Sequence, residues 1–362
     1  MAIPLFDTAT LQAPLHQTIN ERIGEVIERG AFILGPEVEA FEREFADYLG
    51  VRHVVGVGNG TDAITIGLRA LGVQPGDEVV VPSFTFYATA EATVTAGARP
   101  VFCDVDPDTR NITVQTVKAV MTPRTKAIVA VDLFGVPAPL DELRALGVPV
   151  LEDAAQAAGA SLGDRRAGAL ADAATFSFYP SKNLGAFGDG GAIATDDDDV
   201  AALARALRFH GSRDKQSFEY VGYNSRLDEL QAAILRILLV QLDDWCDRRR
   251  AAADAYAQAG IAEYVSPPAV PDGTKPAWHL YVVTHPKADD LIAGLKARDI
   301  GTRGYYRAPL HRQAAMSPYA TDAPLPVTDA LSRDNLALPM SPVLTTSQAG
   351  EVVAALAALV AS

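Results

Sequence analysis

The alternation of short apolar runs with helix-length segments constrains the fold of this chain more than any other feature. Between about Val54 and Thr195, most β-branched runs lead into a stretch long enough to form a helix. The runs lie at 53–58, 77–83, 99–105, 126–135, 148–153, 175–181 and 191–197. Short buried strands separated by helices are typical of βαβ units and of a mostly parallel sheet. The sequence therefore predicts a large α/β domain in which helices flank this sheet.

A different pattern begins near Ser225. A mainly helical stretch extends to about Ala259, and the proline- and glycine-rich segment 267–276 has the composition of a linker. A smaller α+β unit follows, with a strand at 277–285, a helix at 288–301 and a closing helix at 346–360. We therefore predict a large domain over residues 1–245, with an N-terminal arm, and a small C-terminal domain over residues 246–362.

The net charge of −14 limits the classes of partner. Nucleic acids and anionic membrane surfaces are bound by basic stripes, so we expect neither as a partner. An anionic small molecule must be bound by local donors, because the field of the whole chain repels it. No apolar stretch approaches the roughly twenty residues that span a bilayer, and residues 1–15 lack the pattern of a signal peptide.

The cysteines and the acidic run give no sign of a metal site. Cys103 and Cys246 have no CxxC spacing, so we expect buried free thiols and a cytoplasmic protein. The acidic run 196–199 precedes a helical pattern at 199–211. It is expected to begin that helix, because carboxylates are stabilised near the positive end of a helix dipole.

A glycine-rich turn, "GVGNGTDA" (56–63), follows the first strand. Glycines let backbone amides approach an anion and the helix N-terminus adds a favourable dipole, so Gly60 and Thr61 are candidates for a phosphate cradle. A dinucleotide fingerprint is one alternative, but the spacing is GxGxG and the acidic pair at 77–78 begins the next strand instead of ending it. A turn capped by Asn59 or Thr61 is the other alternative.

Two acids, Glu152 and Asp153, end the apolar strand at 148–153. Ligands of open α/β sheets bind at the carboxyl ends of strands. An acid at this place either caps the following turn or holds a cationic heteroaromatic nitrogen, as the ring of pyridoxal 5'-phosphate (PLP) requires.

A single lysine, Lys182, stands between aromatic residues and glycines in "FSFYPSKNLGAFGDGGA" (176–192). We expect Lys182 and Ser177 to face one cavity. A lysine that loses hydration has a lowered pKa and can act as an amine nucleophile, forming a Schiff base with an aldehyde. The alternative is a lysine whose ammonium group reaches water while its stem packs on Phe178.

Together these three features match the parts of a PLP site. The glycine-rich turn would hold the phosphate, Asp153 would keep the ring nitrogen protonated, and Lys182 would hold the aldehyde. Phe86 is expected to stack on one face of the ring, with core packing as the alternative. Ala155 is small enough to let the ring lie against the other face, and Gln156 can hydrogen-bond the ring hydroxyl.

The chain resembles the DegT/DnrJ/StrS sugar aminotransferases, PLP enzymes of the aspartate aminotransferase fold (fold type I). The resemblance covers nearly the whole chain in order. Its segments are "FILGPEVEAFEREFADYLG" (32–50), "GNGTDA" (58–63), "GDEVVVPSFTFYATA" (76–90), "LEDAAQA" (151–157), the lysine segment (176–192), "GYNSRLDELQAA" (222–233) and "WHLYVV" (278–283). It implies a large PLP-binding domain with a mostly parallel sheet, followed by a small α+β domain.

The resemblance also implies roles for single residues. Lys182 is the implied Schiff-base lysine, Asp153 the partner of the pyridine nitrogen and Gln156 that of the ring hydroxyl. The residues implied around the rest of the cofactor are Gly60, Thr61 and Ser177 on the phosphate and Phe86 on the ring. Asn224 matches a position that reaches the phosphate of the neighbouring subunit's cofactor, so a homodimer with two shared active sites is implied.

Substrate recognition is less well defined by the resemblance. Members with a segment similar to "KNLGAFGDGG" aminate C3 of a nucleotide-linked 3-keto-6-deoxyhexose, and members acting at C4 are close neighbours. The segment "GTRGYYRAPLHRQ" (301–313) departs from the family's His-Tyr-Pro run, since Tyr305 and Arg307 replace the histidine and the proline. Tyr306 and His311 match the family, and we expect both to contact the substrate together with Arg307.

An arginine of the same segment is expected to bind the nucleotide diphosphate. Arg303, Arg307 and Arg312 are the candidates, and the alternative is that they are solvated loop residues.

We therefore predict a PLP-dependent aminotransferase that moves an amino group from an amino acid, glutamate in most members, to a nucleotide-linked keto-sugar. The acceptor is expected to be C3 of a dTDP-3-keto-6-deoxyhexose, in deoxyaminosugar biosynthesis, with a C4 acceptor as the alternative. Three other functions compete with this prediction. They are a sugar dehydratase, which carries histidine at the position of Lys182, a non-catalytic regulator that binds PLP or a sugar nucleotide, and a nicotinamide dehydrogenase.

Overall fold

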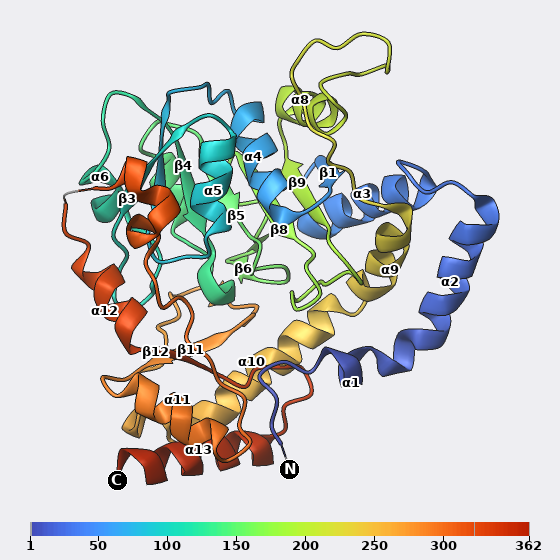
Figure 1. The fold of residues 1–362 in the computed structure, drawn as a ribbon. Coiled ribbons are helices and arrows are strands. Elements are labelled where there is room, and N and C mark those ends of the chain that lie inside the picture. Colours follow the sequence, from blue (N-terminus) through green and yellow to red (C-terminus); the bar gives the residue numbers. More distant parts are fainter. Residues whose placement is uncertain (1, 322, 362) are drawn as a thin grey trace.

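A seven-stranded sheet forms the centre of the computed structural model, which describes residues 2–321 and 323–361 (Figure 1). Its strands are β1 (His53–Val57), β2 (Glu78–Pro82), β3 (Arg99–Cys103), β4 (Thr125–Val131), β5 (Val150–Asp153), β8 (Ala173–Ser177) and β9 (Gly191–Thr195). The order is β1-β9-β8-β5-β4-β2-β3, and β9 runs antiparallel to both of its neighbours while the other pairs are parallel. The predicted mostly parallel sheet is confirmed, and each predicted run overlaps one of these strands.

Helices cover both faces of this sheet (Figure 1). They are α3 (Pro36–Leu49), α4 (Gly60–Ala70), α5 (Ala88–Thr95), α6 (Val114–Lys118), α7 (Leu140–Arg144), α8 (Asp198–Arg208) and α9 (Glu229–Leu239). A further helix, α2 (His16–Arg29), packs against α9. The acidic run does begin α8, where the Asp197 side chain accepts hydrogen bonds from the amides of Asp199 and Val200. Among the described residues, no helix is both long and apolar enough to cross a bilayer.

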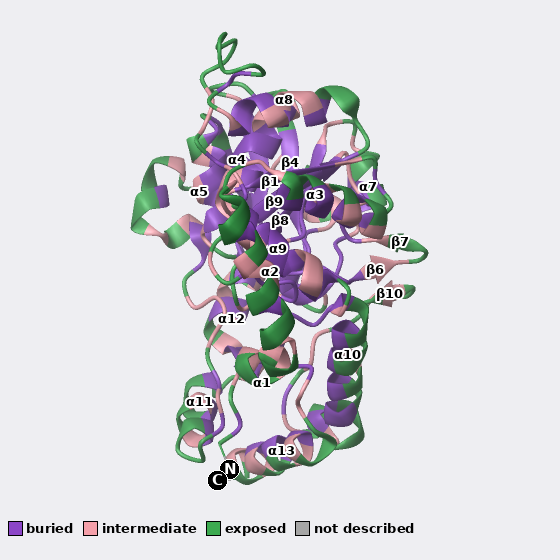
Figure 2. Ribbon diagram, turned by 90° about the vertical axis from the view of Figure 1, so that its right-hand side faces the viewer, coloured by how far each residue is buried: buried purple, intermediate pink, exposed green. Residues whose placement is uncertain are grey.

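Successive side chains of the strands enter different cores. On β1, Val54 packs in the core that includes α3 and α9, whereas Val55 packs in the core that includes α4, α5 and α8. On β5, Leu151 joins the second of these cores and Val150 a third one under the other strands. Side chains of a strand point alternately to the two faces of a sheet, so a sheet covered on both faces needs continuous apolar runs. Figure 2 shows the buried colour concentrated there.

A second unit lies at the carboxyl end of the chain (Figure 1). It contains α10 (Leu242–Gln258), α11 (Ala288–Lys296), α12 (Pro326–Asp334), α13 (Thr346–Val360) and the antiparallel pair β11 (Tyr281–Thr284) and β12 (Asn335–Leu338). The N-terminal segment reaches this unit, since Ile3 and Ile300 form a parallel bridge. The helix α10 runs through residues 245 and 246, and the division into domains 1–245 and 246–362 stays a prediction.

Some elements differ from the sequence-based expectation. The helical stretch 225–259 is two helices, α9 and α10, and β12 and the short helix α1 (Thr8–Gln12) were not anticipated. The expected linker 267–276 contains β10 (Thr274–Lys275), which pairs with a hairpin of β6 (Ser161–Leu162) and β7 (Arg165–Arg166). Strands of two residues carry no detectable period, so sequence patterns miss them.

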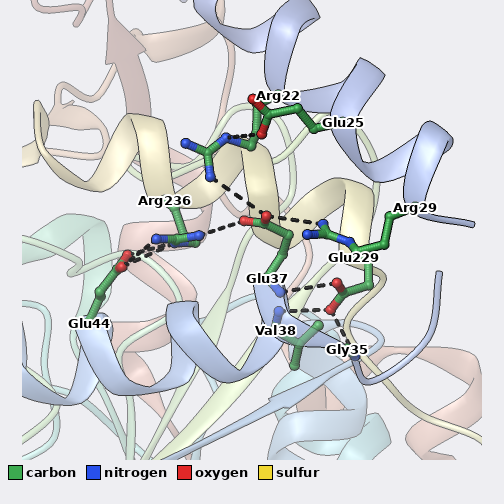
Figure 3. A network of polar contacts seen from close by, with 9 residues as sticks. All are labelled: Arg22, Glu25, Arg29, Gly35, Glu37, Val38, Glu44, Glu229 and Arg236. Carbon is green, nitrogen blue, oxygen red and sulfur yellow. Dashed lines mark hydrogen bonds and ion pairs between the residues drawn. The ribbon is translucent and has the colours of Figure 1, made fainter. Parts of the chain in front are cut away.

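A buried carboxylate joins α9 to the start of α3 (Figure 3). Glu229 is fully buried and accepts hydrogen bonds from the amides of Gly35 at 2.9 Å, Glu37 at 3.0 Å and Val38 at 2.8 Å. These amides belong to the first turn of α3, where helix amides have no acceptor within the helix. An anionic acceptor there also interacts favourably with the helix dipole. The carboxylate thereby fixes α3 relative to α9.

A second buried carboxylate, Glu37, ties α2 into the same network (Figure 3). It forms ion pairs with Arg29 at 3.2 Å, Arg22 at 3.6 Å and Arg236 at 2.6 Å. Burial acts to raise the pKa of Glu37, but the hydrogen bonds of Arg236 and Arg29 outweigh it and hold the pKa below its usual value. The carboxyl group of Glu37 is therefore ionised and links α2, α3 and α9.

Candidate functional site

A cavity of about 1290 Å³ lies at the carboxyl ends of the parallel strands. Asp153 is the last residue of β5 and Ser177 the last of β8, and both line the cavity. The segment 303–308 closes it from the C-terminal unit. The predicted site residues that line this cavity are Gly60, Thr61, Phe86, Asp153, Gln156, Ser177, Lys182, Tyr306 and Arg307. Tertiary packing therefore brings these nine residues together.

Lys182 lies in the turn between β8 and β9. Its amide donates a hydrogen bond to the carbonyl oxygen of Tyr179 at 2.8 Å, which fixes the turn. Burial lowers the pKa of Lys182 to about 8, while the negative charge of Asp153 opposes this shift. An amine with this pKa is half deprotonated near pH 8, so a far larger fraction is in the neutral, nucleophilic form near neutral pH than for an ordinary lysine.

The aromatic residues before Lys182 have a different role from the expected one. Phe176 and Phe178 are fully buried and pack against the rings of Phe41 and Phe45, in the core beneath the site. They anchor the turn that carries the lysine, because a buried aromatic side chain contributes a large apolar contact. Lys182 lines the cavity and burial lowers its pKa, which favours the nucleophile over the snorkelling alternative.

The two acids that end β5 point to opposite sides. Asp153 Oδ2 accepts a hydrogen bond from the hydroxyl of Thr89 at 3.1 Å, and its Oδ1 accepts one from the Ala155 amide at 3.2 Å. Glu152 points away from the cavity and accepts hydrogen bonds from the amides of Gly168 at 2.7 Å and Leu170 at 3.3 Å. Only Asp153 faces the cavity. Adjacent residues of a strand point to opposite faces of the sheet, and the sequence does not show which of the two acids faces the cavity.

Burial raises the pKa of Asp153, and the amide of Ala155, the charge of Lys182 and the Thr89 hydroxyl oppose this effect. A carboxylate buried at 4% exposure is expensive without a cationic partner. A cation that binds in the cavity, in addition to Lys182, would therefore stabilise the ionised form of Asp153. The sequence analysis missed Thr89, although it identified the segment that contains this residue. A threonine within a helix carries no sign in the sequence that its hydroxyl group will bind a carboxylate.

Backbone amides at the start of α4 form the opposite wall. The Asn59 side chain caps this helix by accepting a hydrogen bond from the Asp62 amide at 2.8 Å, which leaves the Gly60 and Thr61 amides without an acceptor inside the helix. A Cβ atom on Gly60 would lie 2.6 Å from Ser177 Cβ. Glycine is therefore required here for the close approach of α4 to β8. The cap is compatible with the predicted phosphate cradle, since it uses only the Asp62 amide.

Aromatic rings and the side-chain amide of Gln156 form the wall of the cavity toward the C-terminal unit. Gln156 donates a hydrogen bond to the Tyr306 hydroxyl at 3.3 Å and accepts one from the Phe134 amide at 2.9 Å. The rings of Phe134 and Tyr306 are stacked with their centroids 6.3 Å apart, and the ring centroid of Phe86 lies 5.9 Å from that of Tyr306. Phe86 is 55% exposed, so it is not a core residue. Its ring lies at the cavity wall, where a planar ligand can stack on it.

A buried histidine also lines the cavity and was not singled out from the sequence. The Nδ1 atom of His279 is buried without a hydrogen-bond partner among the described residues. Burial and the charge of Lys182 hold the pKa of His279 well below its usual value, so the imidazole is neutral. Its segment "WHLYVV" was noted, but a histidine beside a strand is as often a core residue.

Two of the predicted site residues lie outside the cavity. His311 Nδ1 lies 2.7 Å from the Ser83 hydroxyl, and burial lowers the pKa of this histidine. Asn224 forms an antiparallel bridge with Phe209 and is not among the described residues that line the cavity. Their roles stay predictions, and that of Asn224 requires a second subunit.

The residues of the cavity fit pyridoxal phosphate. The site offers a desolvated amine at Lys182, a buried carboxylate at Asp153 and free amides at a helix N-terminus. Its volume exceeds the roughly 300–1,000 Å³ of ordinary small-molecule sites, so a cofactor and a second molecule fit together. A group that is anionic at one end and carries a protonated ring nitrogen fits these residues, and PLP has both properties.

Comparisons with known proteins agree with this chemistry. Residues 14–357 match the model of the DegT/DnrJ/EryC1/StrS aminotransferase family. A dTDP-3-amino-3,4,6-trideoxy-alpha-D-glucose transaminase of Streptomyces venezuelae is 44% identical over 97% of this chain and 94% of its own. A pleiotropic regulatory protein of Geobacillus stearothermophilus is 42% identical over 98% of this chain and 97% of its own.

The crystal structure of S. venezuelae DesV in complex with a ketimine intermediate superimposes with a TM-score of 0.96. The two sequences are 42% identical, and the alignment covers 100% of this chain and 99% of that one. This likeness confirms the predicted fold class, with a large α/β unit and a smaller C-terminal one.

Proposed function

The chain belongs to the DegT/DnrJ/EryC1/StrS aminotransferase family, and on this premise we propose that it transfers an amino group from L-glutamate to a nucleotide-linked keto-sugar. The observation that carries the proposal is that Lys182 and Asp153 line one cavity, where the charge of each opposes the effect of burial on the pKa of the other. The proposed acceptor is C3 of a dTDP-3-keto-6-deoxyhexose, with C4 as the alternative. A relative at 44% identity, named for a 3-amino sugar, supports C3.

The cofactor of this family is PLP, which when bound supplies an electron sink for the transfer. We propose that the amides of Gly60 and Thr61 and the hydroxyl of Ser177 hold its phosphate, and that Asp153 faces its ring nitrogen. The remaining proposed contacts are Gln156 to the ring hydroxyl, Phe86 on the ring face and Asn224 of a second subunit on the phosphate. Each group offers the hydrogen-bonding or stacking chemistry that its role needs.

Lys182 is proposed to move the proton. Its Nζ atom, with a pKa of about 8, takes a proton from the α-carbon of the donor and returns one to the product. A base with a pKa near the working pH is both available and effective. Thr89 holds the Asp153 carboxylate in place during this exchange.

A homodimer is proposed from the exposed apolar side chains as well as from Asn224. Only Ile19 and Val26 of α2 are buried, and Figure 2 shows this helix largely exposed. Other large apolar side chains that are exposed include Ile27, Phe32, Ile33, Phe187, Val221 and Val240. Apolar surface of this kind is typical of a contact between subunits. A cytoplasmic location also stays a prediction.

The purified protein tests the proposed function directly. Protein loaded with PLP should release 2-oxoglutarate when L-glutamate is added, and should then aminate one nucleotide keto-sugar of a panel. The position of the new amine follows from NMR of the product. Borohydride reduction followed by peptide mapping should place the cofactor on Lys182. A protein that binds PLP but releases no keto acid with any amino donor would contradict the proposal.

A non-catalytic regulator is the second candidate, favoured by the name of the Geobacillus stearothermophilus relative. It predicts PLP or sugar-nucleotide binding without turnover. The keto-acid assay separates the two candidates, because only transfer consumes the donor.

A further inference from the structure

We propose that Arg303 binds the diphosphate of the sugar nucleotide and so fixes the direction in which this substrate enters the cavity. This inference rests on the proposed function, because it concerns the substrate of the same site. Arg303 and Arg307 both line the cavity, and Arg312 lies a few residues further on. These arginines were equivalent candidates in the sequence, and their surroundings separate them.

Two of the arginines are already neutralised. Arg307 forms an ion pair with Asp289 at 2.9 Å and donates a hydrogen bond to the carbonyl oxygen of Arg333. Arg312 forms an ion pair with Asp329. A guanidinium group held by a carboxylate must break that pair before it can bind another anion. Arg307 and Arg312 are therefore poor candidates for the first contact with a diphosphate.

Arg303 has no such partner. In the part of the chain that the structure describes, no carboxylate forms an ion pair with its guanidinium group. The guanidinium lies over the ring of Tyr305, 5.4 Å from its centroid. A contact between a cation and an aromatic face restrains the side chain but leaves its hydrogen-bond donors free. Arg303 therefore offers an available positive charge at the cavity.

The backbone of Arg303 is fixed by the C-terminal unit. Its carbonyl oxygen accepts a hydrogen bond from the Ala337 amide at 2.8 Å, and the hydroxyl of Thr302 donates to the Ala337 carbonyl oxygen at 2.8 Å. Ala337 belongs to β12. Tyr305 in turn lies with its edge against Tyr306, at 5.7 Å between ring centroids. The guanidinium is thus carried by a strand and an aromatic pair, not by a free loop.

The charged residues of the cavity come from different elements. The carboxylates of Asp62, Glu91 and Asp189 line the cavity from α4, α5 and the turn before β9. Arg303 lines it from the segment that follows α11. In a chain of net charge −14, an anion is repelled by the first group and attracted by the second. A sugar nucleotide is therefore oriented with its diphosphate toward Arg303.

The diphosphate fits Arg303 better than the carboxylate of the amino donor does. The donor's carboxylate is bonded to the reacting carbon, which must lie beside Lys182. The diphosphate is separated from the reacting carbon by the sugar ring and therefore lies nearer the rim. Arg303 is exposed, whereas Asp153 at the centre of the site is buried. A planar guanidinium also presents two parallel donors to phosphate oxygens.

Calorimetry with dTDP and with thymidine as probes tests the inference on the PLP-loaded protein. Because a hydrogen bond to a charged group is involved, Arg303→Ala should weaken dTDP binding about 10- to 100-fold. Thymidine binding should not change. Arg303→Lys keeps the charge but loses the planar fork, so its affinity for dTDP should be intermediate. Added salt should weaken dTDP binding more in the wild type than in Arg303→Ala.

Arg312→Ala is the matched control, because Arg312 is neutralised by Asp329 and does not line the cavity. It should keep the dTDP affinity of the wild type. The inference is wrong if the wild type binds dTDP no better than thymidine, or if Arg303→Ala binds dTDP like the wild type. If Arg303→Ala slowed the glutamate half-reaction by the same factor by which it weakened dTDP binding, Arg303 would be assigned to the donor carboxylate. That result would overturn the inference.

The inference and the proposed function fail differently. A wild type that binds dTDP through Arg303 but aminates no keto-sugar contradicts only the proposed function. A wild type that aminates a keto-sugar while Arg303→Ala keeps its dTDP affinity contradicts only the inference.

Discussion

At the scale of single residues, the site depends on two ionisable groups whose charged forms are destabilised by burial. Lys182 loses hydration and Asp153 is a carboxylate at 4% exposure. Each stabilises the charged form of the other, as their opposing effects on the two pKa values indicate. Thr89 and the Ala155 amide fix the carboxylate in one orientation. The two residues therefore suit a ligand that reacts with an amine, supplied by Lys182, and carries a cationic group that an anion, supplied by Asp153, can bind.

Replacing Lys182 should remove the transfer and leave the fold intact. Loss of the acid–base step alone should slow both half-reactions about 10²- to 10⁴-fold in Lys182→Ala. The free energy of unfolding should not fall, because a buried amine is itself costly to desolvate. Steady-state assays and urea unfolding measure the two effects. Lys118→Ala, an exposed lysine at the end of α6, is the control and should keep full activity.

Replacing Asp153 should lower the pKa of Lys182 further. In the protein without cofactor, the carboxylate favours the ammonium form, so Asp153→Asn leaves burial acting alone and the pKa falls below about 8. The pH at which an amine-specific reagent labels half of Lys182 should move down accordingly, as followed by mass spectrometry. Asp189→Asn removes an exposed carboxylate of the same cavity and should not move it. A labelling midpoint unchanged in Asp153→Asn would contradict the pairing.

The same shift sets a stability trend with pH. The pKa of Lys182 in the folded protein, about 8, lies below its ordinary value of 10.5. Between these values the unfolded chain binds more protons than the folded one, so this lysine makes the free energy of unfolding rise as the pH increases. Below pH 8 both states are protonated and the contribution is constant.

At the scale of the elements, side chains from distant segments hold the helices in place. Glu229 on α9 supplies the acceptor that the first turn of α3 lacks, and Glu37 joins α2 to both helices (Figure 3). Buried carboxylates are stable only when charges and hydrogen bonds surround them, and both have such partners. The arrangement of α2, α3 and α9 is therefore set by polar contacts as well as by apolar packing.

Removing the Glu229 carboxylate should destabilise the molecule strongly. Glu229→Ala leaves three first-turn amides without an acceptor, and we expect a loss of about 2–4 kcal/mol in the free energy of unfolding. Glu229→Gln keeps an acceptor oxygen and should lose less. Glu25→Ala breaks only an exposed pair with Arg22 within α2 and should lose at most about 0.5 kcal/mol. Urea unfolding compares these variants, and equal losses for Glu229→Ala and Glu25→Ala would contradict the capping role.

At the scale of the whole molecule, one cavity lies between the parallel sheet and the C-terminal unit. Gly60 comes from the start of α4 and Ser177 from β8 of the sheet, whereas Arg303 and Tyr306 come from the segment after α11. Asn224 lies outside this cavity although the family resemblance assigns it to a cofactor phosphate. The proposed second subunit would reconcile these facts, and the exposed side chains around α2 would offer the surface for it.

Mixed dimers test whether Asn224 acts in the partner's site. Lys182→Ala and Asn224→Ala are expected to be weakly active alone. After random reassembly, a mixed dimer has one site with both native residues, so about a quarter of the wild-type activity should return. Sedimentation confirms the dimer and steady-state assays measure the recovery. If Asn224 acted within its own subunit, each site of the mixed dimer would lack one residue and no activity would return.

The sequence by itself determined the features that depend on neighbouring residues. The period of the apolar runs predicted the strands of the main sheet, because burial on both faces demands continuous apolar residues. The glycine-rich turn and Lys182 were identified for a similar reason, since each depends on its own segment. The roles of Asp153 and Gln156 followed from their places in the sequence, the family resemblance supplied that of Ser177, and the cavity brings these residues together.

Only the tertiary structure decided what depends on contacts between distant segments. It decided that Asp153 and not Glu152 faces the cavity, and that His311 is bound to Ser83 outside it. It also decided that Arg303 keeps a free charge while Asp289 and Asp329 neutralise the other two arginines. Side-chain direction and charge pairing depend on residues that packing brings together from far along the chain. A local sequence pattern therefore carries no record of them.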